Sequence, residues 1–250
     1  MSFSITKFLE LLVERKDELL QELIRHINMT VLSLLLSVVV GVVLGVLITR
    51  SKWASKVLIG IANIMQSIPS IALLAISVCF LGIGFAPAVL MVFVYAFLPI
   101  LKNTYTGLKS VSPSHLEVAK GIGLTSFQSL MKVELPMAVP FIMAGIRIAA
   151  VSSVGTVTIA AFAGAKGLGW FINLGLNSLN IEMILLGAIP VSVLALVIDF
   201  IFHKFEQAIT SEGLLPTNKI KNLSDKKLRR RRILSAGAVL LLICISFIQI

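Results

Sequence analysis

The chain has 250 residues, of which 57% are hydrophobic and only 14% are charged, against about 25% charged residues in a soluble globular domain. Residues 57–101 contain no Asp, Glu, Lys or Arg; because a bilayer span needs about 20 apolar residues, this composition excludes a soluble protein and predicts an all-α membrane protein. The net charge of +10 is then explained by Lys and Arg in cytoplasmic loops, and we expect membrane lipid, not nucleic acid, around the chain.

Residues 1–27 have the pattern of an amphipathic helix, because apolar residues recur at helical spacing with acidic residues between them. The segment is not a secretory signal, since it is acidic and lacks a short apolar core behind a basic start. We expect it to lie along the bilayer surface or to lead directly into the first span.

Six membrane spans are expected after this segment. Prolines lie inside several of them, for example Pro69, Pro99 and Pro190, and a proline in a span is tolerated where neighbouring helices satisfy the freed backbone groups. We therefore expect these spans to pack on protein. The six expected spans are Asn28–Thr49, Val57–Val78, Ala86–Tyr105, Met137–Thr158, Glu182–His203 and Ile233–Ile250.

The distribution of Lys and Arg predicts the orientation of these spans. Basic residues concentrate in the loops after the first, third and fifth spans, and the loop after the fifth contains Arg229–Arg232 in a row. The opposite side has only Lys166 in its short loops. The loop after the third span is therefore expected in the cytoplasm, and both the N-terminus and Ile250 are expected outside it.

The connection between the third and fourth spans, residues 109–136, is too long for an unstructured loop. Ser114 and Glu117 fit a capping box for a helix that starts near His115. Gly121 and Gly123 are expected either to end that helix or to let another backbone approach closely. A second helix, Ser126–Glu134, is expected to end at Pro136. A helix pair exposed at the membrane surface is suited to insertion into a groove on a partner.

This connection resembles the cytoplasmic signature of ABC importer membrane subunits, which reads E-A-A, three residues, G, nine residues, I-x-L-P. Val118 and Val133 are mild departures from it. The resemblance implies that the loop forms coupling helices that dock into a separate ATPase subunit. The residues implied in this coupling are Glu117, Val118, Ala119, Gly121, Gly123, Leu124, Leu135 and Pro136.

Four further stretches resemble permeases of importers for glycine betaine, choline and carnitine, and of the related ergothioneine importers. These stretches are QSIPSIALLAI, GIGFAPA, YAFLPILKNTYTGL and AGAKGLG. The resemblance covers residues 28–212 and implies the five-helix core of a type I ABC importer in a bacterial inner membrane, paired with a second copy of itself. Residues 213–232 would form a basic cytoplasmic linker and 233–250 an extra transmembrane helix. Some family members carry a fused solute-binding domain after such a helix, so we expect either that domain or a separate binding protein.

The sequence contains no phosphate-binding loop of the form GxxxxGK[ST], so we expect ATP and Mg²⁺ to bind to the partner ATPase and no cofactor to bind here. No catalytic constellation is visible, and His26, His115 and His203 occupy unrelated positions near membrane boundaries. Cys79 and Cys244 fit neither a CxxC pair nor a metal-ligand spacing. We therefore expect no catalytic or metal site in this chain.

Arg147 and Asp199 are charges inside expected spans, where charged residues usually face the bundle interior. Two interpretations remain open: Arg147 pairs with Asp199 and stabilises the bundle, or Arg147 lines the transport pathway. Aromatic residues, which cage quaternary ammonium groups, make up only 7% of the chain. Substrate selection is therefore expected in the extracytoplasmic binding protein.

Three alternatives to an osmoprotectant permease stay open on the sequence. A methionine-type amino-acid importer shares the loop signature. A proton-coupled secondary carrier would need no coupling loop and usually shows inverted repeats, of which none is clear. A structural or assembly protein without transport activity is the third alternative.

Overall fold

The structure is a computed structural model that describes residues 3–209, and its regular secondary structure in that range is helical. The predicted linker 213–232 and the predicted span 233–250 lie outside the described residues. In chain order the helices are α1 (Ile5–Glu14), α2 (Lys16–Ile48), α3 (Lys52–Ser67), α4 (Ser70–Leu81), α5 (Phe85–Lys109), α6 (Pro113–Gly121), α7 (Ser126–Ser129), the π-helix η1 (Leu130–Glu134), α8 (Leu135–Ala160), the 3₁₀-helix η2 (Ala161–Ala163), α9 (Gly169–Ser178) and α10 (Ile181–Ile209).

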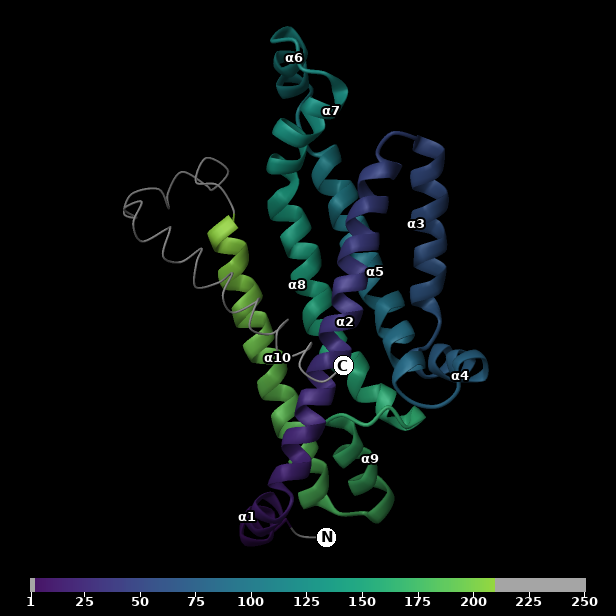
Figure 1. The fold of residues 1–250 in the computed structure, drawn as a ribbon, viewed down its shortest axis with the longest axis vertical. Helices are drawn as coiled ribbons and strands as arrows, with labels where there is room; N and C mark the ends of the chain where they lie inside the picture. The colour runs from purple at the N-terminus through teal and green to yellow at the C-terminus, as the bar shows by residue number, and fades with distance from the viewer. Residues whose placement is uncertain (1–2, 210–250) are drawn as a thin grey trace, which may run out of the picture.

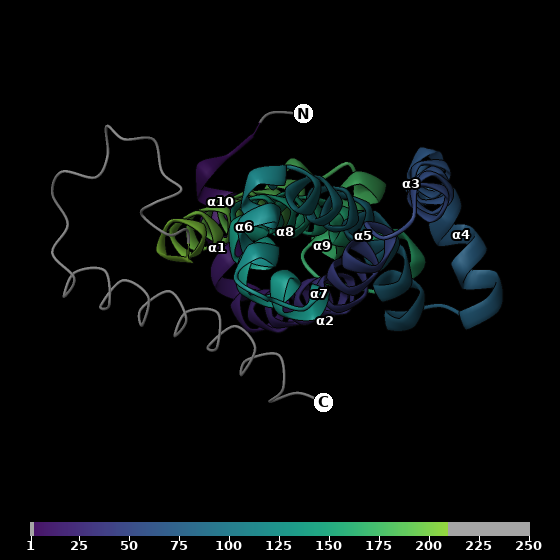
Figure 2. The ribbon, with the colours of Figure 1, turned by 90° about the horizontal axis from the view of Figure 1, so that it is seen from above.

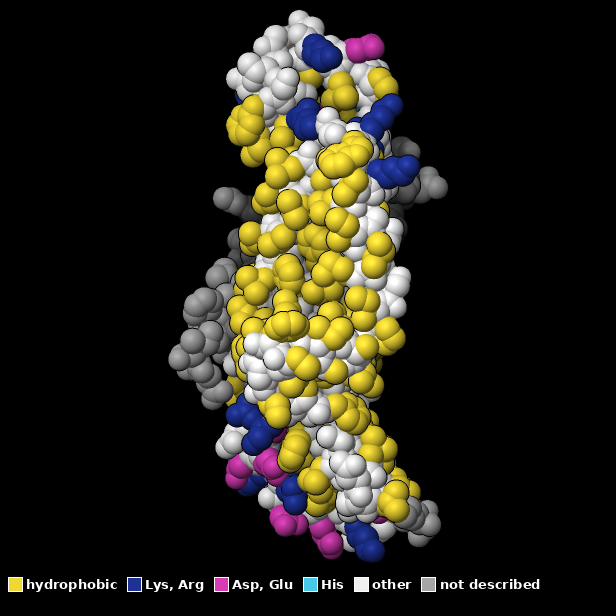
Figure 3. Space-filling view, turned by 90° about the vertical axis from the view of Figure 1, so that its right-hand side faces the viewer, with side chains coloured by type: hydrophobic (Ala, Val, Ile, Leu, Met, Phe, Trp, Pro, Cys, Tyr) yellow, Lys and Arg dark blue, Asp and Glu magenta, His cyan; other side chains and the backbone are white. Residues whose placement is uncertain are grey.

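The helices form an elongated bundle, with α6 at one end and α1 and α9 at the other (Figure 1). We refer to these as the α6 end and the α9 end. Seen along its long axis, the bundle groups α2, α5, α8 and α10 together, while α3 and α4 lie to one side (Figure 2). The charged side chains on the face in Figure 3 gather toward the two ends, and a broad apolar band lies between them.

The first segment forms two helices, so the single amphipathic helix predicted for residues 1–27 is wrong. Arg15 interrupts the helix with φ −106° and ψ 18°, and α2 then runs without a break from Lys16 through the predicted first span. The backbone direction changes there because α1 packs Phe8, Leu11 and Leu12 against a buried cluster that contains Phe171. α1 therefore covers the α9 end of the bundle.

The predicted second span is also not one straight helix. α3 and α4 meet at an angle of 97° across Ile68 and Pro69. Proline forces the residue before it away from the helical region, and Ile68 is accordingly extended, with φ −69° and ψ 129°. The Tyr95 hydroxyl donates a hydrogen bond to the freed Ile68 carbonyl, so a neighbouring helix satisfies this backbone group.

The centre of the bundle consists of α2, α5 and α8, whose backbones approach closely at glycines. A Cβ atom added at Gly45 would lie 2.7 Å from the Thr104 side chain, and one at Gly145 would lie 2.6 Å from Asn103 Cβ. Small residues of this kind let membrane helices pack tightly where the hydrophobic effect gives little drive for association. They also fix α5 as the most enclosed helix, with Met91, Ile100 and Leu101 fully buried.

Four single helical stretches are long and apolar enough to cross a membrane, or five if α3 and α4 together count as one span. The predicted spans 86–105, 137–158 and 182–203 each lie within one of these helices, and the predicted span 28–49 lies within α2 except for Thr49, which is its C-cap. The α2–α3 turn and the α5–α8 connection, two of the predicted basic loops, lie toward the α6 end, and the last described turn of α10 points the same way (Figure 1).

Candidate functional site

The connection between α5 and α8 is the candidate coupling segment, residues 109–136. It forms α6, a short turn and α7, and it projects beyond the other helices at the α6 end (Figure 1). The segment exposes large apolar side chains, among them Val118, Ile122 and Phe127, which are 64%, 72% and 70% accessible. Ala119 on the same helix is instead buried.

The turn of the coupling segment depends on Gly123, as the sequence predicts. Gly123 has φ +80°, a left-handed conformation that glycine adopts without a steric penalty. Its N–H bonds to the Lys120 carbonyl, while the Leu124 N–H bonds back to Ala119 and ends α6. Gly121 is the last residue of α6 and has no neighbour within 4 Å of an added Cβ.

The predicted capping box at Ser114 and Glu117 is wrong. α6 begins at Pro113, where the missing N–H costs nothing and the fixed φ suits a first helical turn, so Ser112 is the N-cap. Ser112 Oγ lies 2.6 Å from His115 Nδ1. No hydrogen bond or ion pair of the Glu117 side chain is found within residues 3–209, which leaves this exposed carboxylate available at the surface.

A capping box occurs instead at the start of α7. The Thr125 hydroxyl accepts from the Gln128 N–H, and the Gln128 side chain accepts from the Thr125 N–H. The predicted helix Ser126–Glu134 does not end at Pro136, because the π-helix η1 leads directly into α8. Pro136 lies in the first turn of α8, where the lack of an N–H is tolerated. Leu135 packs against the buried cluster around Leu108.

Arg147 on α8 and Asp199 on α10 form a bidentate ion pair. Arg147 Nε lies 2.7 Å from Asp199 Oδ1, and Nη2 lies 2.9 Å from Oδ2. The same guanidinium contacts His203 Nδ1 at 2.9 Å and Glu206 Oε2 at 3.4 Å through Nη1. The structure thus brings Arg147 and Asp199 together. Sequence reasoning missed His203 and Glu206, although Asp199, His203 and Glu206 recur at i, i+4 and i+7 on one helix face.

A second polar cluster, which sequence reasoning missed, lies near the α9 end. The Gly167 N–H donates to the buried Glu22 carboxylate at 2.5 Å, and Glu22 also contacts Arg25 at 3.0 Å. His26, fully buried, places Nε2 3.2 Å from the Val154 carbonyl. The Glu22 contact attaches the loop between η2 and α9 to α2, and the His26 contact attaches α8 to α2. No local sequence signal connects residues so far apart.

Replacing Glu22 with Ala should therefore destabilise the described bundle. The Gly167 N–H would stay buried without an acceptor, which costs about 1–3 kcal/mol. The free energy of unfolding in mixed micelles measures this loss. Glu18→Ala is the matched control, because the exposed Glu18–Arg15 pair contributes at most about 1 kcal/mol. Equal losses in both variants would contradict the role assigned to Glu22.

Comparison with known proteins decides the family. Residues 37–211 match the family described as "Binding-protein-dependent transport system inner membrane component". The chain belongs to this family. It is thus a multi-pass inner-membrane permease subunit of an ABC transporter, a class that works with an ATPase and a binding protein and is not itself the ATPase. The predicted family is confirmed.

Similar relatives cover most of the chain. The choline transport system permease protein OpuBB of Bacillus subtilis (strain 168) is 43% identical over 207 residues, which are 83% of this chain and 94% of that protein. The osmoprotectant import permease protein OsmW of Salmonella typhimurium is 38% identical over 195 residues, 76% of this chain and 91% of that protein. In fold, the chain is similar to a chain of the inward-facing MetNI methionine ABC transporter, with a TM-score of 0.67 and 26% identity over 75% of this chain and 94% of that chain.

The remaining expectations concern bound groups. Among residues 3–209, no group of three His, Cys, Asp or Glu side chains is arranged to hold a metal ion. Cys79 is a free and exposed thiol on α4, and Cys244 lies outside the described residues. A permease subunit implies no cofactor site of its own.

Proposed function

We propose that this chain is the permease of an ATP-driven importer for a small quaternary ammonium solute such as glycine betaine, choline, carnitine or ergothioneine. The observation that carries this proposal is the similarity to several permeases whose names specify such solutes, among them choline for OpuBB and glycine betaine, carnitine and choline for OpuCB, at 43% and 41% identity. The methionine transporter chain shares the fold at only 26% identity, which favours a quaternary ammonium solute over the amino-acid alternative.

The coupling segment is the proposed docking site for the ATPase. Its support is the combination of exposed apolar side chains with the unpaired Glu117 carboxylate on an element that leaves the bundle. An exposed apolar patch rimmed by polar groups is typical of a protein interface. In this arrangement Glu117, Val118 and the Gly123 turn would contact the ATPase, while Leu135 and Pro136 would connect the segment rigidly to α8.

Residues 28–212 are the proposed transport core, which would pair with a second copy around a central path. The five-span type I architecture, with α3 and α4 as one bent span, is supported by the similarity in fold to the methionine transporter chain. α1 and the Glu22 cluster would lie on the extracytoplasmic side, where the binding protein delivers the solute. The Arg147 cluster is proposed as a structural element, because all guanidinium nitrogens already have partners.

Uptake by proteoliposomes tests this function. Vesicles that contain the chain, its ATPase and its binding protein should accumulate radiolabelled glycine betaine or choline when ATP is supplied, and should not accumulate methionine. Vesicles without the ATPase are the control. Methionine uptake would support the amino-acid importer, and uptake driven by a proton gradient without ATP would support a secondary carrier.

We also propose that residues 213–232 remain in the cytoplasm and that residues 233–250 cross the membrane outward. The Lys and Arg residues between Lys204 and Arg232 support this topology. A reporter that is active only in the cytoplasm should be active after Thr217 and silent after Ile250. Activity at both positions would contradict a sixth span.

A further inference from the structure

Two adjoining hollows lie at the α6 end, between the end of α2 and the coupling segment. The first, of about 360 Å³, has a largely polar lining that includes Arg50, Lys109, Lys120 and Glu134. The second, of about 460 Å³, is mainly apolar. Arg50 and Ser126 line both hollows, so the polar and the apolar spaces adjoin at these two side chains.

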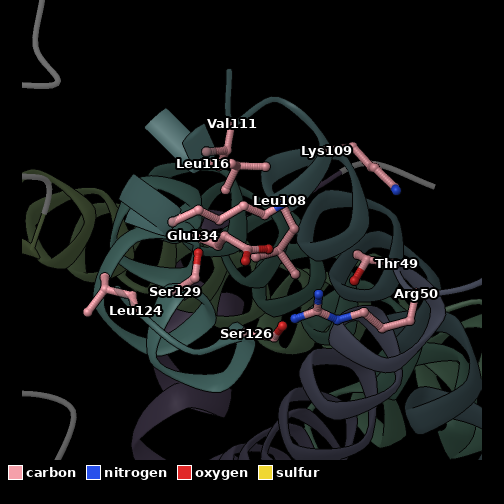
Figure 4. A pocket seen from close by; sticks show the side chains of 11 residues that line it. Thr49, Arg50, Leu108, Lys109, Val111, Leu116, Leu124, Ser126, Ser129 and Glu134 are labelled. Carbon is pink, nitrogen blue, oxygen red and sulfur yellow. The ribbon is translucent and has the colours of Figure 1, made fainter. Parts of the chain in front are cut away.

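The polar hollow carries an excess of positive charge. Its lining holds three basic side chains and one acidic side chain, and none of the four makes an ion pair within the described part of the chain. Figure 4 shows the Arg50 guanidinium extending toward Ser126, with the Glu134 carboxylate and the Ser129 hydroxyl beyond it. The hollow is therefore electrostatically suited to an anion that accepts hydrogen bonds.

The apolar hollow lies at the depth where the membrane helices end. Val46 and Leu47 come from the last turns of the spanning helix α2, and Phe127 and Leu130 come from the other side. Leu47 is 60% accessible, so the hollow opens toward the surrounding lipid. An acyl chain can lie in such a groove without exposing apolar surface to water.

We propose that the two hollows together bind one anionic phospholipid. Its phosphate occupies the polar hollow beside Arg50, and an acyl chain lies along Val46, Leu47 and Leu130. Basic pockets between transmembrane helices on the cytoplasmic side are suited to anionic lipid headgroups, and the basic loops predict that the α6 end is cytoplasmic. The bound lipid bridges α2 and α7, and so holds the base of the coupling segment against the bundle.

Photolabelling of the complete transporter tests this proposal without requiring transport, so its failure is separate from failure of the proposed function. The transporter is placed in phosphatidylcholine vesicles with a trace of phosphatidylglycerol that carries a photoreactive acyl chain. A phosphatidylcholine probe with the same chain is the comparison. We expect the phosphatidylglycerol probe to label peptides that contain residues 46–50 or 126–130 preferentially.

Matched variants identify the side chains responsible. Arg50→Gln should reduce this labelling about fivefold, the effect expected for one basic side chain near the surface. Lys102→Gln removes an exposed charge that lines neither hollow and should leave labelling unchanged. Glu134→Gln removes the acidic side chain and should raise it. If the Arg50→Gln transporter fails to assemble, increased labelling of Glu134→Gln still tests whether the polar hollow binds the lipid headgroup.

Four results would overturn the proposal. Equal labelling by both probes would show that charge is not recognised. Unchanged labelling in both Arg50→Gln and Glu134→Gln would exclude the polar hollow as the binding site of the lipid phosphate. Displacement of the probe by millimolar inorganic phosphate would identify a site for free phosphate. Labelling found only when the ATPase is absent would show that the ATPase covers these hollows.

Discussion

Replacing Gly123 with Asp should weaken binding of the ATPase to this chain at least about tenfold, because an unpaired charge placed in an interface costs about 2 kcal/mol or more. Gly123 stands at the turn between α6 and α7 with φ +80°, and an added Cβ meets no atom within 4 Å in this chain. Aspartate is among the residues that tolerate this conformation best. The chain itself should therefore fold, and the loss should appear at the docking surface.

Gly82→Asp is the matched control for this variant. Gly82 has nearly the same backbone conformation, φ +76°, and equally open surroundings, but it lies in the turn between α4 and α5, away from the coupling segment. Affinity for the purified ATPase is measured for both variants in detergent or nanodiscs. Normal affinity in Gly123→Asp, or an equal loss in Gly82→Asp, would contradict a coupling role for this turn.

Replacing Arg147 with Gln should destabilise the bundle by about 1–3 kcal/mol. The change leaves Asp199 without its bidentate partner inside a spanning segment and removes a contact of Glu206. Breaking a fully buried pair costs about 3–5 kcal/mol, and we expect less here because the Asp199 side chain is 41% accessible. The free energy of unfolding in mixed micelles measures the loss.

A second substitution separates the two interpretations of Arg147. In the double variant Arg147→Gln, Asp199→Asn the uncompensated carboxylate at position 199 is gone, so part of the lost stability should return. Arg15→Gln removes a cation from an exposed pair and should cost less than about 1 kcal/mol. An Arg147→Gln protein of normal stability that nevertheless changes the rate of uptake would favour Arg147 as a pathway residue.

The membrane spans were predictable, because a long run of apolar residues without charge forms few structures other than a membrane helix. The ends of the spans were not predictable. α2 begins at Lys16, well before the predicted start at Asn28, because helical hydrogen bonding continues through a stretch of alternating charged and apolar residues. The bend at Pro69 was underestimated, because a proline inside an apolar run is compatible with either a kinked or a broken helix. In the structure the helix is broken there, since Ile68 is extended, and the Tyr95 hydroxyl donates a hydrogen bond to the Ile68 carbonyl.

The candidate site was predictable to different degrees. The turn at Gly123 was predictable from the two nearby glycines. At the start of α6 the sequence offers both a capping box at Ser114 and a proline at position 113, and the helix begins at Pro113. The contact between Arg147 and Asp199 could be anticipated from the sequence, because opposite charges inside membrane spans usually pair with each other. The contact between Glu22 and Gly167 joins distant parts of the chain, and only the folded bundle brings them together.

The central claim, that the coupling segment carries the contact with the ATPase, is tested most directly by site-specific photocrosslinking. A photoreactive amino acid is placed at Val118, 64% accessible on α6, and separately at Phe80, 84% accessible on α4. In membranes that contain the complete transporter, we expect an adduct with the ATPase from position 118 and none from position 80. The absence of an ATPase adduct at position 118, with normal adducts to other proteins or lipids, would contradict the central claim.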